Sequence, residues 1–117
     1  MKTDNVVRDK SYAFAIRIIK LYKFLCESKK EFNLSKQILR SGTSIGANIE
    51  EAVGGQSTKD FFAKMTIAYK EARETHYWIR LLKDTDFITA EECDSLLKDN
   101  DEILKIIGSI QKTMRNS

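Results

Sequence analysis

Hydrophobic residues recur with helical spacing along almost the whole chain, in four stretches that short polar segments separate. In the first stretch the apolar stripe follows the i, i+4, i+7 rule and consists of Phe14, Ile18, Leu21 and Leu25. The same spacing predicts four helices in all, over residues 5–28, 33–54, 57–84 and 89–114. Because the chain has no proline and only five glycines, few positions can interrupt these helices. The pattern predicts an all-α fold, an antiparallel up-and-down four-helix bundle that forms one domain over residues 1–117.

Capping signals mark the ends of the predicted helices. Asn33 is placed as an N-cap, and Ser57 with Asp60 resembles a capping box in which Asp replaces Glu. The segment Thr89–Glu92 is a full capping box. At the other end of the second helix, Gly54–Gly55 is expected to supply a left-handed C-terminal cap.

The second helix has two distinct sides. Its apolar stripe is Ile38, Gly42, Ile45, Ile49 and Val53. Nearly opposite lies a narrow hydrogen-bonding row that includes Arg40, Ser44, Asn48 and Glu51. Each glycine inside the helix costs about 1 kcal/mol relative to alanine, but small residues let a neighbouring backbone come close. We interpret the small residues as a contact with another subunit and place the polar row at or near it; a solvated polar face and a helix break at Gly42 or Gly46 are the alternatives.

Charge is distributed unevenly, although the net charge is only +3. Residues 1–40 contain ten Lys or Arg against four Asp or Glu, whereas residues 41–104 contain seven against thirteen. Such polarity suits nucleic acid or an oppositely charged subunit. The candidate phosphate contacts are Lys10, Arg17, Lys20, Lys23, Lys112 and Arg115; a solvated face is the simpler interpretation. With no long apolar run, neither a signal peptide nor a membrane span is expected, which makes the cytoplasm the expected compartment.

The residue types that carry chemistry are sparse. His76 is the one histidine, and the two cysteines, Cys26 and Cys93, are far apart and expected to be reduced core residues. A di-iron bundle or a zinc site needs more ligands than these. Glu71 and Glu74 lie one turn apart and could form an acid–base pair, but we expect them to pair with Arg40 or Arg73. No catalytic residue, metal, cofactor or small-molecule substrate is predicted.

The second and third predicted helices together resemble a known family. The second matches R-x-x-x-S-I-x-x-N-I-x-E through Arg40, Ser44, Asn48 and Glu51 with the isoleucines between them, and the third matches the family at positions that include Glu71, Glu74 and Trp78. This looks like the bacterial four-helix-bundle family first noted in proteins encoded by intervening sequences of large-subunit ribosomal RNA genes. The resemblance implies a ring-like homopentamer without enzymatic activity. A related protein, the accessory variability determinant of diversity-generating retroelements, is a basic pentamer that binds nucleic acid and a reverse transcriptase.

Two functional hypotheses follow from these observations. The first is a nucleic-acid-binding accessory protein, which would bind RNA or DNA through the basic residues of the first 40 positions. The second is a protein-interaction or structural oligomer without nucleic acid, because +3 per chain is a modest charge. An enzyme is the least favoured class.

Overall fold

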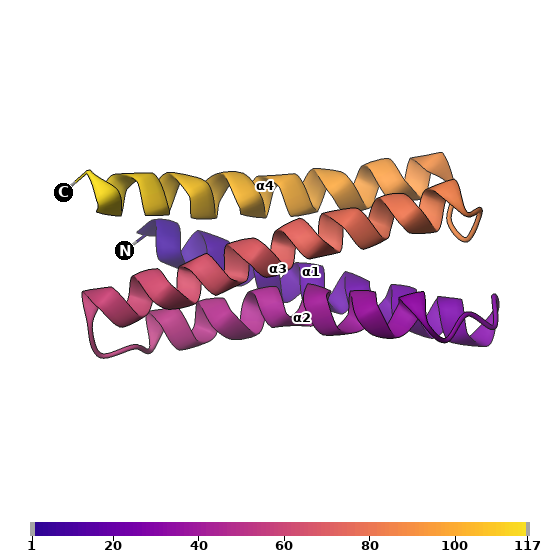
Figure 1. Ribbon diagram of the computed structural model, residues 1–117, viewed down its shortest axis with the longest axis horizontal. Helices are drawn as coiled ribbons and strands as arrows, with labels where there is room; N and C mark the ends of the chain where they lie inside the picture. The colour runs from indigo at the N-terminus through magenta and orange to yellow at the C-terminus, as the bar shows by residue number, and fades with distance from the viewer. Residues whose placement is uncertain (1, 117) are drawn as a thin grey trace.

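The computed structural model describes residues 2–116, and this part of the chain is four α-helices without a strand (Figure 1). The helices are α1 (Lys2–Glu27), α2 (Leu34–Val53), α3 (Thr58–Asp84) and α4 (Ala90–Arg115). Each begins and ends within three residues of the predicted bounds, so the all-α prediction is confirmed. The first and last residues of the domain predicted over 1–117 lie outside the described residues.

Consecutive helices run antiparallel and lie side by side, as expected for an up-and-down bundle (Figure 1). The helix α1 packs on α2 and α4, and α3 packs on the same two, while the backbones of the diagonal pairs lie farther apart. The bundle measures 47 × 21 × 19 Å. Both termini lie at the end that holds the α2–α3 loop, and the α1–α2 and α3–α4 loops lie together at the opposite end (Figure 1).

The core is built from one apolar stripe on each helix. The stripe predicted for α1 is buried in full, from Phe14 to Leu25, and Ile38, Ile45 and Ile49 of α2 have no exposed surface. From α3 and α4 the largest fully buried side chains are Met65, Ile79, Leu82, Ile103 and Ile107. Burying one such side chain contributes about 1.5–3 kcal/mol, so packing rather than helix propensity holds these helices.

The two glycines of α2 lie against α1 of the same chain. A Cβ added at Gly42 would be 2.8 Å from Cγ1 and Cγ2 of Ile18, and one added at Gly46 would be 3.4 Å from the carbonyl oxygen of Ser11. The helix runs through both positions without a break. At Gly42, which is buried, our interpretation that the small residues serve another subunit was therefore wrong, because the atoms that come close are those of the Ile18 side chain in α1. At Gly46, which is only partly buried, the α1 neighbour is Ser11, and a contact with another subunit stays a prediction.

The N-terminus of α2 is capped by a residue that the sequence rules did not indicate. Asn33 makes no side-chain cap hydrogen bond. Instead, the carboxylate of Glu31 accepts hydrogen bonds from the backbone N–H of Asn33, Leu34 and Ser35, at 3.2, 3.1 and 2.8 Å. Burial opposes ionisation of this carboxyl, but the amide hydrogen bonds outweigh it and hold the pKa of Glu31 below its ordinary value.

The predicted N-caps of α3 and α4 are present, whereas the predicted C-cap of α2 is not. Thr89 and Glu92 form the full capping box, while Ser57 accepts a bond from the Asp60 N–H without the reciprocal one. The left-handed glycine cap was wrong: Gly54 has φ −84°, and no described glycine has positive φ. Within residues 2–116, Lys30 and Asp86 are the non-glycine residues with positive φ, one in each loop at the far end of the bundle.

Candidate nucleic-acid interface

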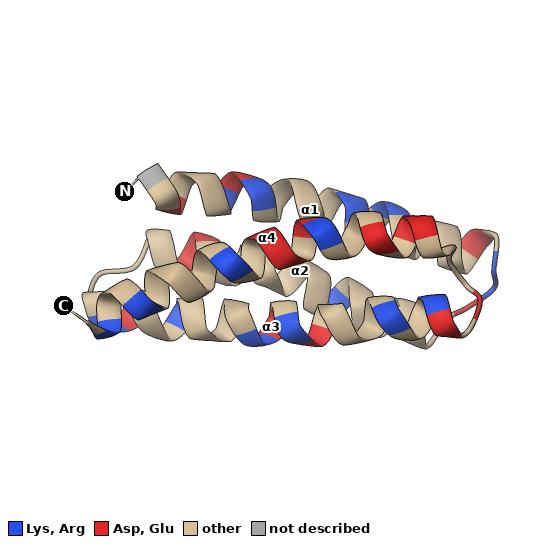
Figure 2. Cartoon of the chain, turned by 90° about the horizontal axis from the view of Figure 1, so that it is seen from above, with Lys and Arg blue, Asp and Glu red and all other residues tan. Residues whose placement is uncertain are grey.

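Two of the six predicted phosphate contacts are already engaged within the chain. Lys10 Nζ lies 2.9 Å from a carboxylate oxygen of Glu102, and Arg17 Nη1 lies 2.7 Å from Oδ2 of Asp99. Arg17 also donates to the carbonyl and hydroxyl oxygens of Ser95. The α4 helix carries many acidic residues in its first half, and α1 lies beside it (Figure 2). The open basic edge predicted for α1 is therefore partly neutralised, because its neighbour carries the opposite charge.

The other four candidates are exposed and have no described acidic group within 4 Å, but they form two separate groups. Lys20 and Lys23 lie in the second half of α1, near the loop end of the bundle. Lys112 and Arg115 lie in the last turn of α4, at the end where the termini are. The structure does not bring these two groups together within one chain, so a single continuous patch of all six residues does not form.

A groove between α1 and α4 borders Lys20. It has a volume of about 730 Å³ and an apolar floor that includes Leu21, Phe24 and Leu96. Arg17 and Lys20 stand on its α1 side, and Glu91 and Glu92 on its α4 side. The opposed charges make the interior of this groove a poor path for a polyanion, since a phosphate lying inside it would approach the two glutamates as well as the basic residues.

A third basic group, absent from the prediction, surrounds the α1–α2 loop. Lys29 and Lys30 lie in the loop and Lys36 in the first turn of α2, and all three are exposed. Basic residues are visible in this loop, at the end of the bundle away from the termini (Figure 2). Phe32, between them, exposes 52% of its surface. The sequence signal for this group is the Lys29–Lys30 pair next to Phe32, an aromatic residue outside every apolar stripe. Helical periodicity does not detect this signal, because these residues lie in a loop.

The family-motif residues form an interhelix cluster between α2 and α3. The guanidinium of Arg40 contacts the carboxylates of both Glu71 and Glu74, and Trp78 Nε1 donates to Glu74 at 2.9 Å. The expected pairing of both glutamates with Arg40 is present, which removes them as a free acid–base pair.

The rest of the polar row is held by shorter-range contacts. Ser44 donates to the Arg40 carbonyl oxygen and Asn48 to that of Ser44, so both side chains bond within α2. Glu51 lies 3.3 Å from Lys64 Nζ on α3. The row thus reaches α3 at its two ends, and its proposed contact with another chain stays a prediction.

The few chemically reactive groups do not converge. Burial raises the pKa of the Cys93 thiol, and Cys26 Sγ lies 3.7 Å from the Ser35 hydroxyl. His76 Nε2 lies 3.5 Å from a carboxylate oxygen of Asp101 on the half-exposed flank of α3. Among the described residues no three His, Cys, Asp or Glu side chains are grouped as metal ligands, and none of the helices there is long and apolar enough to cross a membrane.

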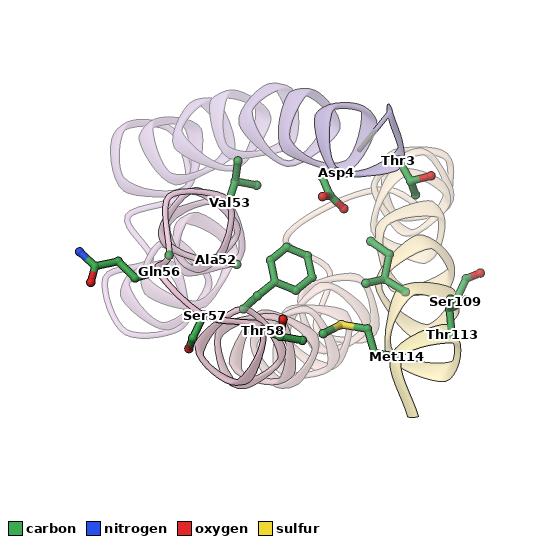
Figure 3. Close-up of a pocket in the computed structure, with 13 residues that line it drawn as sticks. Thr3, Asp4, Ala52, Val53, Gln56, Ser57, Thr58, Ser109, Thr113 and Met114 are labelled. Carbon is green, nitrogen blue, oxygen red and sulfur yellow. The ribbon is translucent and has the colours of Figure 1, made fainter. Parts of the chain in front are cut away.

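A pocket of about 560 Å³ opens at the end of the bundle where the termini lie (Figure 3). Its apolar lining includes Val53, Phe61 and Ile110, and Met114 points into it while Gln56 points away. Threonine and serine residues of α1, α3 and α4 also line the pocket, and the hydroxyl of Ser109 points away from its centre (Figure 3). The described lining also includes the carboxylate of Asp4 and contains no histidine or cysteine.

An exposed apolar row runs along the outer side of α1. Tyr12, Ile16 and Ile19 repeat at i, i+4 and i+7, and Tyr12 exposes 67% of its surface. The row borders a hollow of about 220 Å³ between α1 and α2, next to Ala15 and Ala47. A row of large exposed apolar side chains marks an interaction surface more often than a single exposed apolar residue does.

The fold and these contacts define a four-helix-bundle protein whose polar clusters join helices. A family model, described as the 23S rRNA-intervening sequence protein, matches residues 3–109. The chain therefore belongs to the 23S rRNA-intervening sequence protein family, and the resemblance of its second and third helices is confirmed. No curated protein matches the chain.

A solved structure is similar over almost its full length. It is the crystal structure of a protein of unknown function from the S23 ribosomal protein family of Bacteroides thetaiotaomicron, 58% identical to this chain, with a TM-score of 0.93. The match covers 94% of this chain and 98% of that one.

Proposed function

We propose that this protein is a non-enzymatic, self-associating bundle that binds nucleic acid through its basic surface. The observation that carries the proposal is the exposed lysine side chains of Lys20 and Lys23, which have no described acidic partner within 4 Å and continue toward the basic α1–α2 loop. The solved structure that is 58% identical to this chain is described as a member of the S23 ribosomal protein family, and that description supports RNA as the class of partner.

The proposed contacts are phosphate contacts. Lysine presents a flexible point charge without the planar, bidentate geometry by which arginine reads a base, so binding is expected to be largely independent of sequence. It is also expected to weaken steeply with salt, since each neutralised phosphate releases counterions. Repetition of the surface around a pentamer, the assembly that the resemblance implies, would raise the effective concentration of a weak single-chain site.

The test compares the wild type with Lys20→Glu/Lys23→Glu on structured RNA and duplex DNA, at low and moderate salt. These positions are preferable to Arg17, because removing Arg17 also breaks its ion pair with Asp99. The matched control is Lys59→Glu/Lys70→Glu, which makes the same charge change at exposed positions of α3. We expect the first variant to lose most binding and the control to retain it. Absence of wild-type binding at low salt, or equal losses in both variants, would contradict the proposal.

A second candidate function, a protein scaffold without nucleic acid, is favoured by the apolar row Tyr12, Ile16 and Ile19. In this proposal α1 of one copy packs against another copy, and the same row forms the subunit contact of the assembly. Light scattering should give a mass well above 13.5 kDa for the wild type. Ile16→Glu/Ile19→Glu should dissociate the assembly, whereas Ile67→Glu, at a similarly exposed position on α3, should not. A wild-type monomer at micromolar concentration would exclude self-association.

A further inference from the structure

We propose that the α1–α2 loop is a binding site for unpaired nucleotides, in which a base stacks on Phe32 and the flanking phosphates contact Lys29, Lys30 and Lys36. This inference rests on the proposed nucleic-acid binding and adds the class of ligand, a single strand in preference to a duplex. Single-strand sites combine a basic surface with exposed aromatic rings, since every base has a π-face but a paired base does not offer it.

The loop is held so that Phe32 faces outward. The backbone N–H of Glu31 donates to the carbonyl oxygen of Leu25 at 2.9 Å, and its carboxylate accepts from the N–H groups of the N-cap residue Asn33 and of the first two residues of α2. The Ser35 hydroxyl donates to the Glu31 carbonyl oxygen at 2.8 Å. Because Glu31 is tied to both helices, the backbone next to Phe32 is held in place while the Phe32 ring is half exposed. A loop backbone that is already ordered loses little conformational freedom on binding.

Charge at the loop favours an anion. Lys29, Lys30 and Lys36 lie within four residues of Phe32, so chain geometry keeps their Cα atoms within about 14 Å of it. The negative charge of Glu31 faces the α2 amides, where the helix dipole offsets it. Glu27 is the remaining acidic residue on this hairpin between Lys20 and Lys36.

The charges of neighbouring helices favour one path for the bound nucleic-acid strand. The acidic residues Glu91 and Glu92 line the far side of the α1–α4 groove, and Asp84 and Asp86 stand at the α3–α4 loop. A strand stacked on Phe32 should therefore run along the α1–α2 edge, toward Lys23, rather than across the groove. Phe24 exposes 37% of its surface against 52% for Phe32, and Lys29 Nζ lies 5.8 Å from the Phe24 ring centroid, so we assign the stacking to Phe32.

The experiment measures fluorescence anisotropy of a labelled oligouridylate and of an RNA duplex of equal length, with the full chain at low salt. We expect wild type to bind the single strand more tightly, Phe32→Ala to weaken that binding about 5- to 100-fold, and Phe32→Trp to restore it. Duplex binding should be unaffected by either change. The matched control is Tyr77→Ala, an aromatic of similar exposure on α3. Lys29→Gln/Lys36→Gln should weaken binding of both the single strand and the duplex, and should reduce the dependence of the affinity on salt concentration.

The outcomes separate this inference from the proposed function. If wild type binds neither ligand, the proposed function fails and this inference with it. If wild type binds both ligands equally and Phe32→Ala behaves like Tyr77→Ala, stacking on Phe32 is wrong while phosphate binding stands. Circular dichroism and light scattering of each variant must match wild type, and a loss of binding that follows a loss of assembly in Phe32→Ala would also overturn the stacking assignment.

Discussion

Gly42 of α2 lies so close to Ile18 of α1 that an added Cβ would be 2.8 Å from two of its side-chain carbons. Ile18 is β-branched and fully buried, so its side chain has little freedom to move away. We expect Gly42→Ala to destabilise the protein, because overpacking costs about 1–3 kcal/mol against a gain of about 1 kcal/mol in helix propensity. Thermal unfolding should show the decrease, at roughly 4 °C per kcal/mol.

Gly46 provides the matched control on the same helix. The nearest atoms to an added Cβ there are the carbonyl and hydroxyl oxygens of Ser11 at 3.4 Å, an ordinary van der Waals distance. Gly46→Ala should therefore keep or raise the melting temperature, with a gain of up to about 1 kcal/mol. Equal effects at the two glycines would contradict the close approach of α1 and α2 at Gly42.

The Glu31 cap should make stability depend on pH with a defined sign. The folded-state pKa of Glu31 is lowered, so its contribution is complete above the unfolded value of about 4.3 and is lost as pH falls through the folded value. We expect Glu31→Gln to lower the free energy of unfolding at neutral pH, by up to about 2 kcal/mol as for other N-caps, and to match wild type in strong acid. Urea unfolding at the two pH values measures this. The matched control is Glu27→Gln, which removes a nearby exposed carboxylate and should lower the free energy of unfolding at neutral pH by less than Glu31→Gln does.

Asn100 tests how the core tolerates a buried amide. Its side chain is fully buried, its Nδ2 donates to the Ala72 carbonyl oxygen at 3.0 Å, and no described group donates to its Oδ1. We expect the free energy of unfolding of Asn100→Leu to be within about 1.5 kcal/mol of the wild-type value, or higher than it. The substitution removes an amide that has only one of its two groups hydrogen-bonded and replaces it with a side chain of similar volume. Asn100→Asp should be much less stable at neutral pH and recover in acid, because burial raises a carboxyl pKa. A large loss for Asn100→Leu in chemical unfolding would mean that the amide fixes the helix register.

Arg40 should matter through its pairing with two carboxylates at once. Glu71 and Glu74 lie one turn apart on α3, so removal of the cation leaves two like charges facing each other. We expect Arg40→Ala to destabilise the protein and Arg40→Lys to recover only part of the loss, since an ammonium cannot match the fork of the guanidinium. Added salt should narrow the difference in denaturation midpoint between wild type and Arg40→Ala.

The helices could be predicted from sequence because each of them buries one periodic stripe, as Phe14 and Ile18 illustrate. The contacts of Lys10 and Arg17 could not be, since they depend on which face α4 turns toward α1. Periodicity gives the phase of each helix by itself and leaves the rotation of its neighbour undetermined. Glu31 was missed for a related reason: it lies two residues before the N-cap position and reaches the α2 amides only through the loop conformation at Lys30.

The uneven packing of the bundle has a consequence for hydrogen exchange. The helices α2 and α3 pack together most extensively and α1 and α4 least, so the α1–α4 seam is where the bundle can open with the smallest loss of contact. Amide protons of α2 and α3 should therefore exchange last, and those of α1 earlier. A second copy seated on Tyr12 and Ile16 would slow exchange in α1 as protein concentration rises, which makes the protection of this one helix a direct readout of assembly.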